Sequence, residues 1–165
     1  MYIVNALLAE LKYEAGSTRK LLEAVPFENF DFKPHEKSMT LGRLATHIAE
    51  IPHWATDTIT SGEFDFAARS FAPRTASSKE ELMKIFEENF QNAVAALENS
   101  NDELLNTNWT MRRGEQIFFT MPRKVAIRSW AYNHLYHHRG QLSVYLRLLN
   151  VPVPGMYGPS ADDAG

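Results

Sequence analysis

The chain has 165 residues, of which 44% are hydrophobic and 22% charged, and its formal net charge is −3. This size and composition are typical of one soluble domain spanning residues 1–165, and the charge gives no reason to expect nucleic acid or an anionic membrane as partner. The lack of cysteine excludes disulfides, thiolate metal sites and a cysteine nucleophile. We expect a cytoplasmic protein, because no signal-peptide pattern or transmembrane-length apolar run is present.

The first predicted helix spans residues 2 to about 24. Its apolar residues recur at steps of three or four, which is the period of one buried helical face. Pro26 stops the pattern because proline cannot continue a helix, and residues 27–38 are an irregular, aromatic-rich connection. The apolar face consists of Ile3, Leu7, Leu8, Leu11, Ala15, Leu21 and Leu22.

The second predicted helix begins after an N-cap at Ser38 or Thr40 and ends at Gly62. Pro52 lies inside its pattern and predicts a kink, since proline lacks the N–H that a helix interior uses. His47 lies about one turn before this kink and shares the inward face of the helix. That face consists of Leu41, Leu44, His47, Ile48, Ile51 and Ala55.

The third predicted helix follows a long connection, residues 61–77. Two overlapping capping boxes mark its start, one pairing Ser77 with Glu80 and the other pairing Ser78 with Glu81. Its inward face consists of Leu82, Ile85, Phe86, Phe90 (or Asn89), Ala93 and Leu97. The aromatic residues that we expect to pack within the preceding connection are Phe64, Phe66 and Phe71.

The last third of the chain contains the fourth long helix. Residues 106–121 precede it and form either a small hairpin or an ordered loop. Pro122 suits the first turn of this helix, which continues to about Leu149. The Pro- and Gly-rich tail, residues 151–160, is not helical. We expect the tail to pack on the helices through Val153, Met156 and Tyr157.

Four long amphipathic helices of this kind predict an all-α fold, a four-helix bundle with a non-helical C-terminal tail. The connections over residues 61–77 and 100–121 are long enough to cross from one end of a bundle to the other. The helices therefore need not follow a simple up-down-up-down order, and we expect long crossover connections between them.

Three of the six histidines lie on inward helical faces. His134 and His138 are one turn apart on the fourth helix, where the apolar pattern would otherwise place leucine, and His47 lies on the second helix. Side chains at i and i+4 can converge on one point, and burying three imidazoles without a shared partner costs desolvation three times. A divalent metal removes that cost, so we predict a metal site formed by His47, His134 and His138.

Two alternatives to this assignment stay open from the sequence. His137, at i+3 from His134, can replace His138 as the second ligand, although it lies one residue off the apolar stripe. All three histidines can also be hydrogen-bonded core residues without a metal. The pattern lacks the glutamate of H-E-x-x-H, so a metalloprotease would have no general base in its usual place.

A site with three nitrogen ligands leaves coordination positions for water or substrate, as catalytic metal sites do. Such a metal can lower the pKa of bound water or ionise an incoming thiol. Glu50, one turn after His47, is a candidate base or orienting group, with a solvated helix residue as the alternative. Arg139 is a candidate for binding a cofactor or substrate anion or the chain's tail, with a surface salt bridge as the alternative. Gln141 can bond an imidazole or a neighbouring helix.

Three segments resemble the DinB/YfiT (damage-inducible) family of metalloenzymes. Residues 38–50, Ser-Met-Thr-Leu-Gly-Arg-Leu-Ala-Thr-His-Ile-Ala-Glu, are similar to the second-helix motif of that family. Residues 134–147 and 154–162, with His-His-Arg-Gly-Gln and Tyr-Gly-Pro-Ser, are similar to its C-terminal signature. The resemblance implies a four-helix bundle with an unusual connection order, a homodimer, and zinc or nickel held by three histidines. In this sequence those histidines are His47, His134 and His138.

The resemblance also implies a class of reaction. Some members of the family are thiol S-transferases that use low-molecular-weight thiols such as bacillithiol, mycothiol or glutathione, and one branch isomerises maleylpyruvate. The leading hypothesis is that a metal-bound thiolate attacks a small-molecule electrophile. The alternatives are metal-assisted hydrolysis, and a non-catalytic metal-binding stress-response protein whose site is closed by a fourth protein ligand.

Overall fold

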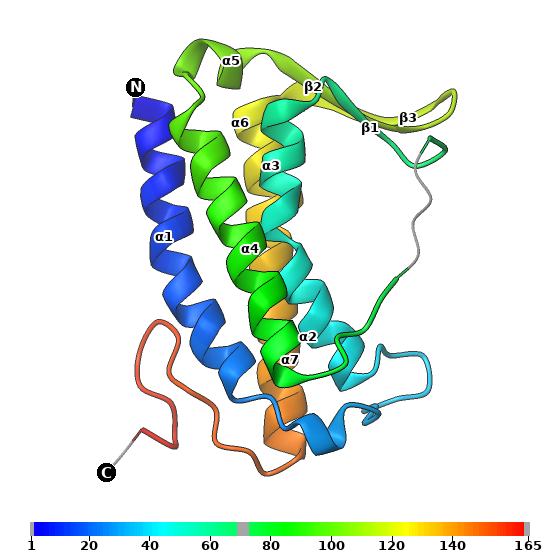
Figure 1. Cartoon of the computed structure of the whole chain (residues 1–165), viewed down its shortest axis with the longest axis vertical. Helices are drawn as coiled ribbons and strands as arrows, with labels where there is room; N and C mark the ends of the chain where they lie inside the picture. Colours follow the sequence, from blue (N-terminus) through cyan, green and yellow to red (C-terminus); the bar gives the residue numbers. More distant parts are fainter. Residues whose placement is uncertain (1, 69–72, 164–165) are drawn as a thin grey trace.

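The computed structural model describes residues 2–68 and 73–163, and Phe71 lies outside these residues. The long helices lie side by side in a bundle (Figure 1). In this view α1 runs down the molecule, α2, α3 and α4 run up, and the helix that contains α7 runs down. Because α2, α3 and α4 run in the same direction, the chain crosses the length of the bundle between α3 and α4. The long helices are α1 (Tyr2–Glu23), α2 (Leu41–Glu50), α3 (Pro52–Thr60), α4 (Lys79–Glu98) and α7 (Asn133–Leu148).

A small sheet at one end of the bundle corrects the prediction of a purely all-α fold. β2 (Asn108–Arg113) and β3 (Gln116–Pro122) form an antiparallel hairpin, so the region predicted as hairpin or loop is a hairpin. β1 (Glu63–Asp65) pairs in parallel with β2 and completes the sheet in the order β1-β2-β3. We predicted a loop around β1 because three residues are too few to display the alternation of a strand. The sheet covers a second, smaller core formed by Phe64, Trp109, Met111 and Ala126.

The second predicted helix is divided in two at Pro52. Thr40 caps its start, since its hydroxyl accepts a hydrogen bond from the Arg43 N–H at 3.1 Å. Ile51 keeps right-handed helical dihedral angles, with φ −57° and ψ −38°, while Pro52 has no N–H to donate and begins α3. The predicted break therefore places His47 in the last turn of α2 and Trp54 in the first turn of α3.

The fourth predicted helix is continuous in direction but not in hydrogen bonding. It consists of α6 (Arg123–Ala126), a π-helical segment η2 (Ile127–Tyr132) and α7. A π turn bonds residue i to residue i+5 and so shifts the side chains around the helix axis relative to an α-helix. We had predicted one regular helix, and a hydrophobic pattern does not reveal such a local change. The segment ends two residues before His134, and π turns are common beside functional sites.

The remaining described segments close the two ends of the bundle. A short 3₁₀ turn, η1 (Phe27–Asn29), and a short helix, α5 (Asp102–Asn106), lie in the connections. The tail is not helical, as predicted, and Val153 is buried while Met156 packs against the core. Tyr157 also holds the tail, but through its hydroxyl: the residue is 66% exposed, and the hydroxyl donates a hydrogen bond to Glu14 at 2.9 Å.

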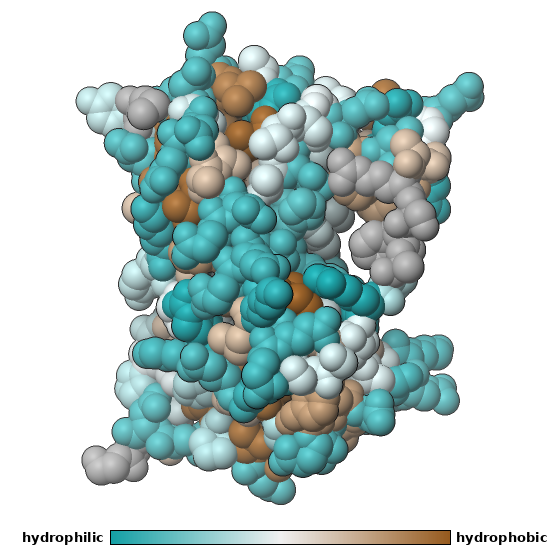
Figure 2. Space-filling model, in the orientation of Figure 1, coloured by the Kyte–Doolittle hydropathy of each residue, from teal (hydrophilic) through white to brown (hydrophobic). Residues whose placement is uncertain are grey.

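The surface is mainly polar on the face in Figure 2, where apolar residues form small separate groups. The apolar faces of the helices instead meet in one core, in which Leu21, Leu44 and Leu82 are fully buried. Within the described residues, no helix combines the length and the apolar character that crossing a membrane requires.

Gly42→Ala is expected to destabilise the protein by about 1–3 kcal/mol, because it would overpack the start of α2. A Cβ at this position would lie 2.5 Å from Phe30 Cδ2 and 3.0 Å from Thr75 Cγ2. Urea unfolding measures the change. Gly16→Ala in α1 is the matched control, since its Cβ would meet nothing within 4 Å and alanine raises helix propensity by up to about 1 kcal/mol. Equal stability of the two variants would contradict the close packing at Gly42.

Candidate metal centre

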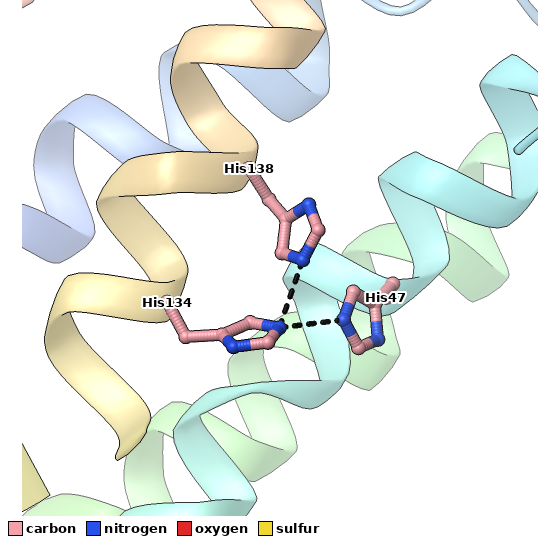
Figure 3. Close-up of side chains that lie close together, drawn as sticks. All are labelled: His47, His134 and His138. Atoms are coloured by element: carbon pink, nitrogen blue, oxygen red, sulfur yellow. Dashed lines mark hydrogen bonds between the residues drawn. The ribbon is translucent and has the colours of Figure 1, made fainter. Parts of the chain in front are cut away.

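The three predicted histidines converge on one point between α2 and α7 (Figure 3). His134 Nε2 lies 3.1 Å from His47 Nε2 and 2.8 Å from His138 Nε2. His138 is 7% exposed, and the other two rings are half-buried. The helical spacing of His134 and His138 and the packing of α2 against α7 therefore bring together three side chains that are up to 91 positions apart in the sequence.

The orientation of His138 is fixed by Gln141, one turn later on α7. His138 Nδ1 lies 2.7 Å from Gln141 Oε1, an atom that can only accept a hydrogen bond. Nδ1 of His138 therefore carries its proton, and the lone pair of Nε2 faces the other two histidines. This is the usual arrangement of a metal-binding imidazole, whose second nitrogen donates to an oxygen.

Neutral imidazoles alone do not satisfy all the contacts in this cluster. Arg43 Nη2 lies 3.3 Å from His47 Nδ1, and a guanidinium can only donate, so Nε2 of His47 carries the proton. If His134 Nε2 is protonated, its proton opposes that of His47. If His134 Nε2 is not protonated, its lone pair opposes that of His138. One of the two short contacts is therefore repulsive in either tautomer of His134.

A divalent cation would fit between these nitrogens after a small outward shift of the rings. Metal–imidazole bonds of about 2.0–2.1 Å at tetrahedral angles place ligand nitrogens about 3.4 Å apart, slightly farther than the two distances observed. A small outward shift of the rings would accommodate the ion, and all three Nε2 lone pairs would then have a partner. Among the described residues, the group that can hold a metal consists of His47, His134 and His138. His137, the alternative ligand, is not in this group.

Burial keeps the cluster uncharged near neutral pH. Burial, together with a smaller effect of the neighbouring His138, lowers the pKa of His47 to about 3 and the pKa of His134 to about 4. Burial also lowers the pKa of His138, against a smaller opposing effect of its hydrogen bond to Gln141. Neutral imidazole is the form that binds metals, so these shifts keep the three ligands available at neutral pH.

Acid is expected to destabilise the metal-free protein, beginning near pH 6.5, the ordinary pKa of histidine. The folded-state pKa values of His47 and His134 are lowered to about 3 and about 4, so the unfolded chain binds more protons between these values and 6.5. The free energy of unfolding therefore falls as the pH falls through this window. Urea unfolding of metal-free protein between pH 7 and 5 measures the slope. His134→Gln should give a shallower slope, and an unchanged slope would contradict the prediction.

Two tryptophans shield one side of the cluster. The rings of Trp54 and Trp130 are stacked with centroids 4.3 Å apart, and the Trp54 ring lies 4.7 Å from the ring of His134. Trp54 also borders a cavity of about 310 Å³, whose other lining residues are Glu50, His53, Arg74 and Asn89. Sequence reasoning did not reveal this role of the tryptophans, because stacking between α3 and η2 is not encoded in local spacing.

Glu50 lies beside this cavity and is bound to two arginines. Its Oε2 accepts a hydrogen bond from Arg43 Nη2 at 3.0 Å, and its Oε1 lies 3.4 Å from Arg74 Nε. Arg43 thus lies between the Glu50 carboxylate and His47, and contacts both. Sequence reasoning missed Arg43, although its position four residues before His47 on one helix was a usable signal. The role of Glu50 as a base stays a prediction.

Arg139 points away from the histidines and lies under the tail. It is 3% exposed and forms an ion pair with Glu14 of α1, which is 8% exposed. The guanidinium also donates to Thr18 Oγ1 at 3.1 Å and to the hydroxyl of Tyr157. The predicted surface salt bridge is therefore a buried one, and Arg139 fixes the tail to α1. A role of Arg139 in cofactor binding stays a prediction.

The other histidines have ordinary surroundings. His35 Nδ1 accepts a hydrogen bond from the Lys37 N–H at 3.1 Å in the connection before α2. His53 is half exposed and lies 3.5 Å from Asp57, one turn later on α3. The ring of His137 contacts that of His138 at a centroid distance of 4.9 Å.

A mostly helical bundle with three inward histidines from two helices defines a candidate metal-binding protein. The sequence matches the model of the DinB family over residues 1–164, so the chain belongs to that family. Among its relatives, the uncharacterized protein YrdA of Bacillus subtilis (strain 168) is 28% identical over 167 residues, which cover 97% of this chain and 91% of YrdA. The uncharacterized protein YjoA of the same organism is 26% identical over 146 residues, covering 87% and 88%.

Solved structures are similar over nearly the same range. A DinB-like protein from Bacillus cereus ATCC 10987 has a TM-score of 0.73 and 27% identity, and the match covers 93% of this chain and 97% of that one. The DinB-like protein YjoA from Bacillus subtilis has a TM-score of 0.69 at 21% identity, covering 92% and 97%, which is a likeness of fold alone. These matches confirm the family resemblance read from the sequence.

Proposed function

We propose that this protein is a divalent-metal-dependent enzyme that transfers a low-molecular-weight thiol to a small electrophile. The observation that carries the proposal is the convergence of one ring nitrogen from each of three histidines within 4.8 Å of one another, in an arrangement that neutral imidazoles alone do not satisfy. Three protein ligands leave positions for an exogenous ligand, which is the property of catalytic sites. Imidazole ligands suit zinc and nickel, the metals that we expect here.

A bound divalent metal would supply Lewis acidity and hold an incoming thiol as its thiolate, the more nucleophilic form. The chain has no cysteine, so the thiol must come from a small molecule. His47, His134 and His138 would hold the metal, with Gln141 orienting His138. Trp54 and Trp130 would exclude water from one side of His134. We assign the electrophile to the cavity of about 310 Å³ that Trp54 and Glu50 line, beside the cluster and not lined by the three histidines themselves.

The proposal is tested with untagged protein purified without chelators. Elemental analysis is expected to find about one divalent metal per chain. Assays that combine bacillithiol, mycothiol or glutathione with electrophiles such as chlorodinitrobenzene or an epoxide should then show metal-dependent S-transfer. His137→Ala is the matched control for His134→Ala, because His137 is the neighbouring histidine that lies outside the cluster. The control should keep both metal and activity.

Other outcomes distinguish the remaining functions. Ester or amide cleavage that needs metal but no thiol would replace S-transfer by hydrolysis, for which Glu50 is the candidate base. Metal binding without turnover of any thiol or ester would favour a non-catalytic stress-response role. The family resemblance further leads us to propose a homodimer in the cytoplasm. Light scattering of the purified protein tests the oligomeric state.

A further inference from the structure

Arg43 links a proposed metal ligand to a carboxylate and to the segment before α4. Its Nη2 atom lies 3.3 Å from His47 Nδ1 and 3.0 Å from Glu50 Oε2. Its Nη1 atom donates to the backbone oxygen of Arg74 at 2.9 Å. The side chains of Arg43 and Glu50 are only 15% and 22% exposed, so these contacts are largely shielded from bulk water.

The contact between Arg43 and His47 has a polarity that opposes metal binding. A guanidinium has donors and no acceptor, so it can bond His47 Nδ1 only while that nitrogen has no proton. A neutral imidazole that gives its Nε2 lone pair to a metal carries its proton on Nδ1. Two donors would then face each other at His47 Nδ1, and the positive charge of Arg43 would also lie close to the cation.

Glu50 is the acceptor in position to replace Arg43. Residues 43, 47 and 50 are spaced by four and three, so their side chains share one face of α2. Arg43 already holds the Glu50 carboxylate beside His47. Carboxylates are common partners of the second nitrogen of a metal-binding histidine, where they fix its tautomer and increase its basicity.

We infer that metal binding exchanges the partner of His47, so that Arg43 leaves Nδ1 and Glu50 accepts the hydrogen bond from it. Glu50 is then a positioning residue for His47, and Arg43 is a competitor that stabilises the metal-free arrangement. Because Arg43 also holds the Arg74 backbone, the exchange couples metal binding to the segment between residue 73 and α4. This inference rests on the metal site of the proposed function and adds its regulation by the chain's own residues.

The exchange predicts opposite effects of two substitutions on the affinity for zinc. Glu50→Ala should weaken zinc binding about 10–100-fold, as removal of such a partner does, and Glu50→Gln should recover part of the loss because its amide oxygen still accepts. Arg43→Met should tighten zinc binding about tenfold, because it removes the donor that opposes Nδ1–H. Isothermal titration calorimetry, or competition with a chromogenic chelator, measures both affinities.

Arg74→Met is the matched control for charge. Arg74 is also cationic and also pairs with Glu50 at 3.4 Å, but the Arg43 guanidinium is the one at His47. The exchange is supported if Arg43→Met increases the affinity for zinc clearly more than Arg74→Met does. If both substitutions increase the affinity for zinc equally, the inference is overturned, because the effect is then one of overall charge. If Arg43→Met decreases the affinity for zinc, the inference is also overturned, because Arg43 then only supports the structure of the site.

A second measurement uses the wild-type protein and does not depend on how the variants fold. Zinc titration followed by ¹⁵N side-chain NMR is expected to shift the guanidinium resonances of Arg43, and unchanged resonances in zinc-loaded protein overturn the inference. Metal uptake by the wild type separates a failure of the proposed function from a failure of the exchange. If the wild type takes up no metal, the proposed function fails together with the exchange. If the wild type binds zinc but the zinc affinities of the variants or the Arg43 resonances differ from those expected, only the exchange fails.

Discussion

His134→Ala is expected to lower the affinity for a divalent metal by more than about 100-fold, because loss of an outer partner alone costs about 10–100-fold. His134 is the central residue of the cluster, since its Nε2 lies 3.1 Å from that of His47 and 2.8 Å from that of His138. Its removal leaves two ligands on different helices. Elemental analysis of the purified variant and calorimetric titration with zinc or nickel measure the effect.

The metal-free form of this variant should remain folded. His134 makes one repulsive contact in either tautomer, so alanine removes an unfavourable interaction along with the favourable one. Circular dichroism of metal-free wild type and variant checks that helix content is unchanged. His137→Ala should bind metal as the wild type does, and equal loss of affinity in the two variants would contradict the assignment of His134.

Arg139→Met is expected to destabilise the protein by about 3–5 kcal/mol, because it leaves the Glu14 carboxylate buried without its cationic partner. Glu14 keeps one other partner in the Tyr157 hydroxyl, at 2.9 Å. For a chain of this size the loss corresponds to a fall in Tm of roughly 6–20 °C. Thermal unfolding followed by circular dichroism measures the fall in Tm.

Two controls separate the buried pair from ion pairs in general. Lys12 and Glu98 form an exposed pair with side chains 49% and 51% accessible, so Lys12→Met should change stability by less than about 1 kcal/mol. The double variant Glu14→Met, Arg139→Met should recover much of the lost stability, since apolar side chains of similar volume can replace a buried pair. If Arg139→Met alone lowers the free energy of unfolding by less than about 1 kcal/mol, the Glu14 carboxylate is not buried and unscreened as we infer.

Features that depend on neighbours within four residues were predictable from the sequence. Thr40 and Ser78 cap α2 and α4 through hydrogen bonds to N–H groups three residues later. Pro52 divides the second helix because a missing N–H acts locally. The inward positions of His47, His134 and His138 followed from the same helical period. The tautomers of the rings are the exception, because the helical spacing places Arg43 near His47 and Gln141 near His138 but does not fix which of their atoms meet.

Features that depend on distant residues were not predictable in this way. β1 pairs with β2, 47 positions further along the chain, and a three-residue strand carries no pattern of its own. The environment of Arg139 is set by Glu14, 125 positions away, which turned an expected surface residue into a buried one.

The sequence by itself therefore determined the long helices, their caps and breaks, the family and the faces on which three histidines lie, because helical period and capping are local interactions. Only the tertiary structure decided that these faces meet. It also decided that two tryptophans shield His134 and that Arg139 holds the tail. These contacts arise from packing between helices, which depends on the whole set of buried side chains.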